Sequence, residues 1–211
     1  MESIEVENYY HIYNRGAGKA DIFCFSDDYK HFINKYFYYL YIPAETYAWC
    51  LLRNHFHLLI RVRTAEEQET IFHSAKNIYP AGTFYGDHFN TIKPYKASKQ
   101  FSHLFNSYTK YFNAKNGRSG TLVEGSFKRK RIVDEANFLH LACYIHRNPI
   151  HHGITENYTG YTQSSYQDIL AGNHTLLERN QLMDRFGGKE NFIASHQEFR
   201  EKLGSDFYLE E

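Results

Sequence analysis

The segment from His55 to Arg63 alternates between two kinds of side chain. One row is apolar and the other carries histidine and arginine: Phe56, Leu58, Ile60 and Val62 form the first, and His55, His57, Leu59, Arg61 and Arg63 the second. Successive side chains of a β-strand point to opposite faces of its sheet. The segment is therefore predicted to be a strand whose apolar face is covered by helices, with two imidazoles side by side on the opposite face.

Similar patterns elsewhere supply the partners of this strand. Strands are predicted over residues 8–14, 46–52, 55–63 and 127–133. Helices are predicted where apolar residues recur at helical spacing, over Ser26 to Leu40, Ser98 to Phe112 and Asp134 to Arg147. Because proline disfavours helical geometry in the residue before it, Pro149 is expected to end the last helix at Asn148.

This order of elements predicts an α+β fold. The sequence β-α-β-β-α-β is that of a ferredoxin-like split βαβ plan with an antiparallel sheet, to which the last helix is an addition. We expect residues 1–157 to form one domain and residues 158–211, whose helical patterning is weaker, to pack on it as a helical extension. Residues 64–96 are polar, contain two prolines, and are interpreted as a long loop or insertion.

The composition excludes several classes of protein. Aromatic residues make up 18% of the chain, enough for a real core, which argues against disorder of the whole chain. The 3 cysteines include no C-x-x-C pair, which suits reduced thiols in a cytosol. The first residues lack the basic and apolar regions of a secretory signal, and no apolar run reaches membrane-spanning length. We expect a cytoplasmic protein without a membrane contact, either a monomer or a homodimer.

The histidine pair is one half of a candidate catalytic site. Two imidazoles at positions i and i+2 of a strand can bind one divalent metal. Arg61 and Arg63 lie further along the same row, where their guanidinium groups can meet phosphate. In a chain with 13 histidines such a pair also arises by chance, so the spacing alone leaves open an ordinary structural pair.

The other half lies in the predicted helix before Pro149. The core stripe of that helix consists of Phe138, Leu141, Ala142 and Ile145. Tyr144 lies about 100° from the centre of the stripe, and Asn148 lies one turn further along the same flank. A tyrosine hydroxyl can act as a nucleophile, with His140 and His146 as nearby candidates for a general base. The same spacing also suits a half-buried tyrosine and an ordinary polar helix end.

A basic stripe inside a neutral protein is a candidate phosphate-binding surface. The formal net charge is +0, but seven basic residues stand against one acid between Lys110 and Arg131. They are Lys110, Lys115, Arg118, Lys128, Arg129, Lys130 and Arg131. Such a stripe can bind the backbone of a nucleic acid, and it is also compatible with an ordinary solvated surface.

Five motifs in order along nearly the whole chain resemble those of REP-associated tyrosine transposases. This family is related to the single-tyrosine insertion-sequence transposases within the HUH endonuclease superfamily. The motifs are Tyr10-His11-Ile12-Tyr13-Asn14-Arg15-Gly16, Leu52-Arg53-Asn54-His55-Phe56-His57-Leu58-Leu59, Ser107-Tyr108-Thr109-Lys110-Tyr111-Phe112-Asn113, Tyr144-Ile145-His146-Arg147-Asn148-Pro149 and Ser164-Ser165-Tyr166.

The resemblance implies a role for each half of the candidate site. His55 and His57 match the metal ligands of the family, and Tyr144 matches its nucleophile. Asn148 occupies the place, one turn later, where relatives supply a third ligand. The implied enzyme cleaves single-stranded DNA near a hairpin or palindromic repeat such as a REP element, through a 5′-phosphotyrosine intermediate. Its implied cofactor is a divalent metal, Mg or Mn, and reversal by a 3′-hydroxyl rejoins strands.

The expected DNA contacts combine the resemblance with the basic residues. They are Arg15, Arg61, Arg63, Lys110, Lys128, Arg129, Lys130, Arg131 and Arg147. Two departures from the family pattern stand out. Gly125-Ser126-Phe127 replaces the usual Gly-Arg-Phe, so one basic contact is missing, and the 64–96 segment is longer than the usual connection.

Two other classes of function remain open from the residues. A ferredoxin-like sheet with exposed aromatic residues also suits a non-catalytic module that binds single-stranded nucleic acid, although the chain lacks the Arg/Lys-Gly-Phe-x-Phe strand motif. A metal-dependent hydrolase acting on small phosphoesters is the second alternative. A covalent adduct between protein and oligonucleotide separates the transposase-like enzyme from both.

Overall fold

The computed structural model describes residues 3–78, 94–172 and 176–199. The strands are β1 (Tyr9–Arg15), β2 (Ala44–Leu52), β3 (His55–Val62) and β4 (Lys128–Ile132). The α-helices are α1 (Ser26–Leu40), α2 (Ala65–Ile78), α3 (Ala97–Lys115), α4 (Glu135–His151), α5 (Tyr166–Ala171), α6 (Arg179–Phe186) and α7 (Lys189–Gln197). Two 3-10 turns are η1 (Ala17–Lys19) and η2 (Tyr158–Gly160).

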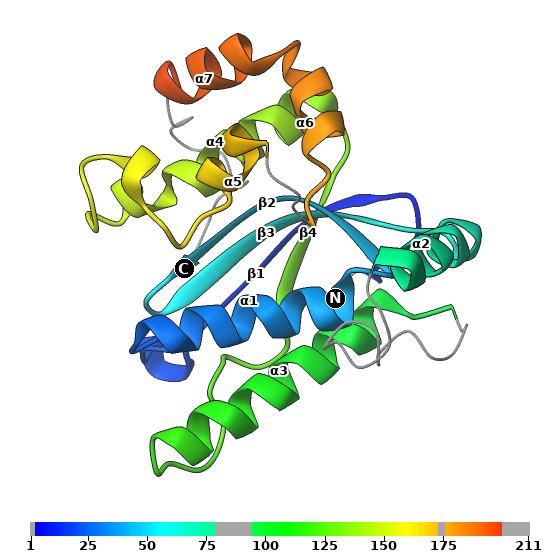
Figure 1. Ribbon diagram of the computed structural model, residues 1–211. Helices are drawn as coiled ribbons and strands as arrows, with labels where there is room; N and C mark the ends of the chain where they lie inside the picture. The colour runs from blue at the N-terminus through cyan, green and yellow to red at the C-terminus, as the bar shows by residue number, and fades with distance from the viewer. Residues whose placement is uncertain (1–2, 79–93, 173–175, 200–211) are drawn as a thin grey trace.

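The strands form one antiparallel sheet in the order β2-β3-β1-β4. This order, with β1 and β3 in the centre, confirms the predicted ferredoxin-like plan. Helices α1 and α3 lie against one face of the sheet, and α4 to α7 lie on the other (Figure 1). Among the described residues, none of the helices is long and apolar enough to cross a membrane.

The face under α1 and α3 is lined by the apolar row of β3. Phe56, Leu58 and Ile60 are fully buried there, in one cluster with aromatic residues of both helices. Burying such side chains contributes about 1.5–3 kcal/mol each. The alternation in the sequence thus predicted the correct face of the strand.

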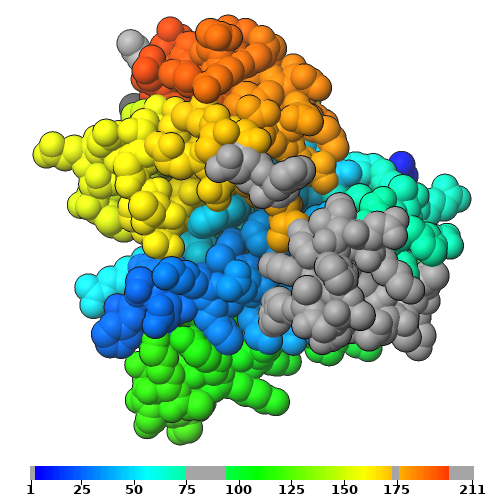
Figure 2. Space-filling model, viewed as in Figure 1, coloured from blue at the N-terminus to red at the C-terminus, as the bar shows by residue number. Residues whose placement is uncertain are grey.

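The face under α4 holds a second core. The predicted stripe of α4 packs here against Leu59 of β3. Helices α5, α6 and α7 add apolar side chains to the same cluster, among them Ile169, Leu182 and Phe192. In the space-filling view α6 and α7, orange to red, lie directly beside the yellow residues that follow α4 in the chain (Figure 2). Residues beyond 157 therefore share a core with the helix that carries Tyr144.

The prediction of a loop over 64–96 is wrong for residues 65–78, which form α2. Thr64 and Glu67 explain the helix. The Glu67 carboxylate accepts from the backbone N–H of Thr64 at 2.8 Å, and the Thr64 hydroxyl accepts from the N–H of Glu67 at 3.2 Å. This reciprocal arrangement is a capping box, which satisfies two backbone donors at the start of a helix. Residues 94–96 have no regular secondary structure, as predicted, and residues 79–93 lie outside the described residues.

Helix α4 also runs further than predicted, because it continues through Pro149 to His151. Proline removes one hydrogen bond and crowds the carbonyl four residues before it. Here that cost falls in the last turn, where Pro149 and Asn148 are both buried and His152 closes the helix with a bond from its N–H to the Asn148 carbonyl at 3.0 Å. The extra turn brings residue 152 to the same end of the sheet as His55.

Candidate functional site

Side chains from β1, β3 and α4 meet on the sheet face that α4 covers. Nδ1 of His57 on β3 lies 2.8 Å from Nε2 of His11 on β1. The Tyr144 ring on α4 stands edge-on to both imidazoles, with 5.8 Å between ring centres for His57 and 6.3 Å for His11. Tyr144 is buried, with 2% of its surface exposed. The predicted nucleophile and one predicted metal ligand are therefore neighbours.

The second predicted ligand lies at the start of β3. His55 is 5.2 Å from His57 between ring centres, and the two rings are nearly perpendicular. Its Nε2 lies 3.4 Å from the amide oxygen of Asn148 and 3.2 Å from Nε2 of His152. The fold thus brings together all the residues predicted for the nucleophile and the metal, from segments about ninety positions apart in the sequence.

A pocket opens beside the histidines. Its lining consists of Tyr13, Asn14, Arg15, Lys19, Asn54, His55, Phe56, His57, Lys128 and His152. These residues come from β1, η1, the β2–β3 turn, β3, β4 and the end of α4. The pocket combines nitrogen ligands, aromatic surface and cationic side chains, which is a composition suited to a metal and a phosphate group together.

The arrangement around His55 fits a divalent metal. Nδ1 of His55 lies 2.7 Å from the amide oxygen of Asn54, which only accepts, so Nδ1 carries the proton and Nε2 presents its lone pair. The Asn148 amide oxygen faces that lone pair. The amide nitrogen of Asn148 is buried and has no hydrogen-bond partner among the described residues. Two facing lone pairs repel each other, and a shared cation removes the repulsion.

The amide is essential to any such site. Within the described ranges, there is no group of three or more His, Cys, Asp or Glu side chains that could hold a metal ion. A site at this place therefore depends on the oxygen of Asn148 together with imidazole nitrogens.

Several predicted DNA contacts surround this cluster. Arg15 and Lys128 line the pocket beside the histidines, and Arg15 forms an ion pair with Glu124 at 2.7 Å. The register of β1 with β4 places Lys130 on the same sheet face as the histidines. Arg147 lines a smaller depression next to the predicted nucleophile. These cations lie within one region around the site.

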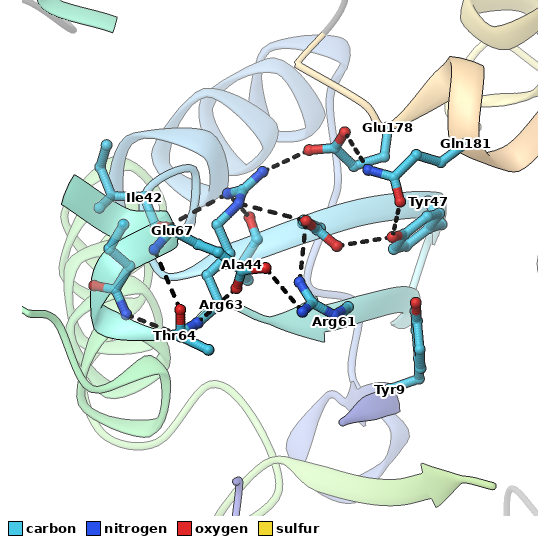
Figure 3. Close-up of polar contacts among 12 residues, drawn as sticks. Tyr9, Ile42, Ala44, Tyr47, Arg61, Arg63, Thr64, Glu67, Glu178 and Gln181 are labelled. Carbon is cyan, nitrogen blue, oxygen red and sulfur yellow. Dashed lines mark hydrogen bonds and ion pairs between the residues drawn. The ribbon is translucent and has the colours of Figure 1, made fainter. Parts of the chain in front are cut away.

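Arg61 and Arg63 are exceptions, because the protein itself neutralises them (Figure 3). Arg61 pairs with Glu45 at 3.2 Å and with Glu67 at 2.9 Å. Arg63, whose side chain is 2% exposed, donates to three backbone carbonyls and to Glu178. The burial of Arg63 contradicts its predicted contact with phosphate, and Arg61 is held in the same network. Alternation gave their sheet face correctly, but it could not reveal acidic partners from distant segments.

Three other predicted contacts lie away from the cluster. Arg129 and Arg131 alternate with the lysines of β4 and therefore point to the opposite sheet face, where Arg129 lies over the ring of Phe127 at 5.3 Å. Lys110 is exposed on α3, which covers that opposite face. The predicted basic stripe is thus divided between the two faces of the sheet.

A buried hydrogen-bond chain fastens the C-terminal helices to α4. The carbonyl of Phe192 accepts from Nδ1 of His196 at 2.7 Å, and Nε2 of His196 accepts from Nδ1 of His146 at 2.8 Å. Nε2 of His146 accepts from the Ser165 hydroxyl at 2.8 Å, which in turn accepts from the backbone N–H of Trp49 at 2.9 Å. Burial holds the pKa of His146 well below its ordinary value. Both histidines are therefore neutral links between α7, α4 and β2.

The two histidines suggested as general bases lie elsewhere on α4. His146 uses both ring nitrogens in the buried chain, which contradicts that role. His140 packs its ring against Phe199, with 4.5 Å between ring centres. The imidazoles beside the Tyr144 ring are instead those of His11, His57 and, at the end of α4, His151.

Sequence reasoning missed His11 and His152. His11 had a detectable signal, because strand alternation places it on the same face as Tyr9 and Tyr13, and antiparallel pairing of β1 with β3 then sets it near His57. His152 lies four positions after Asn148, a spacing that continues one helix flank. The prediction that the helix ends at proline hid this second signal.

Comparison with solved structures finds one related fold. A REP-associated tyrosine transposase bound to a REP hairpin superimposes with a TM-score of 0.50, over 83% of this chain and 87% of that chain. The two sequences are 14% identical, so the match shows a shared fold. Comparison with models of protein families and with curated proteins finds no match.

Proposed function

We propose that this protein is a transposase-like enzyme that cleaves and rejoins single-stranded DNA near hairpin-forming repeats. Tyr144 is its nucleophile, and His55, His57 and Asn148 hold a divalent metal, Mg or Mn. The observation that carries the proposal is the set of neighbouring contacts that links these four side chains of β3 and α4: Asn148 with His55, His55 with His57, and His57 with Tyr144. The fold shared with a transposase bound to a hairpin supports the same class of substrate.

Each residue has a task in this reaction. The Tyr144 oxygen forms a bond to phosphorus while the bond from phosphorus to the 3′ oxygen of the neighbouring nucleotide breaks. The tyrosine loses its proton and the departing 3′ oxygen gains one, so the products are a 5′-phosphotyrosine and a free 3′-hydroxyl. A tyrosine hydroxyl with a pKa near 10 is a weak nucleophile at neutral pH and needs assistance. A divalent metal held by His55, His57 and Asn148 would supply this assistance by polarising the scissile phosphate.

The surroundings of the site suit an extended DNA strand. Arg15 and Lys128 at the pocket supply cations for phosphate, and Tyr13 between them offers a ring on which an unpaired base can stack. Lys128 lies 5.9 Å from the centre of that ring, so charge and stacking surface are adjacent. Single-stranded DNA is recognised by this combination in many proteins.

The decisive experiment is the capture of a covalent adduct. Native protein is incubated with a hairpin-bearing single-stranded oligonucleotide and Mg²⁺ or Mn²⁺, then separated on a denaturing gel. We expect an adduct with the native protein and none with Tyr144→Phe, which still binds the oligonucleotide. Tyr13→Phe is the matched control, since Tyr13 lines the pocket beside the histidines, and it should keep the adduct.

Four outcomes contradict the proposal. An undiminished adduct with Tyr144→Phe removes the nucleophile, and its loss only in Tyr13→Phe moves the role to the other ring. Binding without any adduct in the native protein favours the non-catalytic module. Normal metal-dependent cleavage in both His55→Ala and His57→Ala removes their role as ligands.

A further inference from the structure

His152 brings another imidazole to the predicted metal site. Because α4 continues through Pro149, His152 caps the helix four residues beyond Asn148. Its Nε2 lies 3.2 Å from Nε2 of His55, and the two ring centres are 4.4 Å apart at an angle of 64°. Both side chains line the same pocket.

The distances from Nε2 of His55 to the other two donor atoms match those between neighbouring ligands of a single ion. Metal–nitrogen and metal–oxygen bonds of the relevant ions are about 2.1 Å long, so neighbouring ligands stand about 3.0 Å apart at right angles and about 3.4 Å apart in a tetrahedron. In this protein the separation is 3.2 Å between the ring nitrogens of His55 and His152, and 3.4 Å between His55 and the Asn148 oxygen. Both values fall inside that interval.

The tautomer of His55 orients its ring for binding a metal. Its Nδ1 proton is given to the amide oxygen of Asn54 at 2.7 Å, a contact that fixes the ring and turns the Nε2 lone pair toward His152 and Asn148. Histidine ligands of metals commonly hold their second nitrogen in this way. The ring is therefore oriented for a ligand before any metal arrives.

We propose that His152 is a further ligand of the divalent metal, beside His55, His57 and Asn148, and that this nitrogen-rich set binds Mn²⁺ or Co²⁺ more tightly than Mg²⁺. Imidazole nitrogen suits transition-metal ions, whereas Mg²⁺ takes oxygen ligands and keeps several waters. This inference adds a ligand to the proposed metal site, and it rests on the proposed function only for the role of the metal in catalysis. A plain hydrogen bond between His55 and His152 is the alternative.

The test measures metal binding directly, in protein that cannot react. All variants are made in the Tyr144→Phe background and titrated with Mn²⁺ and Mg²⁺ by calorimetry. We expect His152→Ala to weaken Mn²⁺ binding by at least about 10-fold, the lower limit of what loss of a mere supporting partner costs in other metal proteins. His151→Ala is the matched control, an exposed neighbouring histidine that should leave binding unchanged.

A spectroscopic measurement makes the result specific. Pulsed electron paramagnetic resonance of bound Mn²⁺ detects coordinated imidazole nitrogen, and its signal should decrease in His152→Ala. Urea unfolding followed by the fluorescence of Trp49 verifies that the variant is folded. His152 is exposed, so the substitution leaves the core intact.

The outcomes separate this inference from the proposed function. If His152→Ala binds Mn²⁺ as the background protein does while His55→Ala does not, His152 is only a hydrogen-bond partner and the inference is overturned. Equal affinity for Mg²⁺ and Mn²⁺ overturns the selectivity. Neither result touches the nucleophile, whose test is the covalent adduct of protein with Tyr144 present.

Discussion

Acid should destabilise the folded protein through protonation of His196, the buried histidine of α7. Its ring is fully buried and accepts a hydrogen bond from His146 while donating one to the Phe192 carbonyl. Burial, together with the positive charge of Arg147, lowers the pKa of His196 from its ordinary value of 6.5 to about 4, against the Phe192 bond that raises it. The perturbation to apply is a shift from pH 7 to pH 4.5, in native protein and in His196→Phe.

The sign and size follow from the difference between the folded and unfolded states. At pH 7 the imidazole of His196 is neutral in both states. Below pH 6.5 the unfolded chain takes up a proton that the folded protein refuses until the pH approaches 4. Because the unfolded state binds more protons in this window, the free energy of unfolding decreases as the pH is lowered, by about 2.5 kcal/mol at pH 4.5.

The variant isolates this contribution from that of all other groups. At pH 7, His196→Phe loses two hydrogen bonds and leaves Nδ1 of His146 unpaired, which costs about 2 kcal/mol. The variant has no imidazole to protonate at position 196. The difference in free energy of unfolding between native protein and variant should therefore shrink to near zero by pH 4.5. Urea unfolding can be followed by Trp49, the chain's single tryptophan, which lies in the same hydrogen-bond chain. His103→Phe, on the exposed surface of α3, controls for removal of a histidine elsewhere.

A difference in free energy of unfolding between native protein and His196→Phe that stays the same at both pH values would contradict this prediction. A constant difference means that His196 has an ordinary affinity for protons in the folded state. A difference that grows on acidification means that the folded protein favours the charged ring, which reverses the sign. Either result contradicts the neutral hydrogen-bond chain.

Three further predictions concern other parts of the molecule. Arg63→Ala should lower the free energy of unfolding by about 3 kcal/mol in urea titrations, because it leaves buried carboxylates and carbonyls unpaired. Gly16→Ala should lower the free energy of unfolding by about 1–3 kcal/mol, seen as a lower melting temperature, because a Cβ at this position would lie 1.8 Å from the Ala20 carbonyl oxygen. Lys130→Glu should weaken binding of single-stranded DNA and reduce the salt dependence, by about 0.7 in logarithmic slope per lost phosphate contact, whereas Lys110→Glu on the far face should not.

Strand patterns in the sequence predicted the sheet, whereas one helix, α2, was missed and the end of another, α4, was placed too early. Alternation along β3 is a local property, so the faces of Phe56 and His57 could be assigned without knowing any partner. The capping box of Thr64 and Glu67 was equally local but was overlooked among polar residues. The passage of α4 through Pro149 could not be read locally, because it depends on burial of the last turn against the sheet.

The candidate site shows the same division between local and distant information. The pairing of Tyr144 with Asn148 follows from helical spacing, and the pairing of His55 with His57 from strand spacing. Their meeting depends on the fold, and so do the ion pairs that remove Arg63 from any contact with phosphate. The partner Glu178 lies 115 positions away, at the start of α6, where no short-range pattern connects the two.

The two edges of the sheet have different consequences for contact between copies of this chain. At the β2 edge, backbone bonds from residues 163–165 to Trp49 and Leu51 occupy groups that another strand could use. In the described part of the chain, β4 ends the sheet on the other side with Lys128, Arg129, Lys130 and Arg131 in succession. A second copy arriving edge to edge brings the same four charges opposite them, and like charges facing each other across strands are destabilising. Repulsion between the basic side chains of β4 thus opposes aggregation through this edge. A polyanion that binds β4 neutralises these side chains and removes the repulsion.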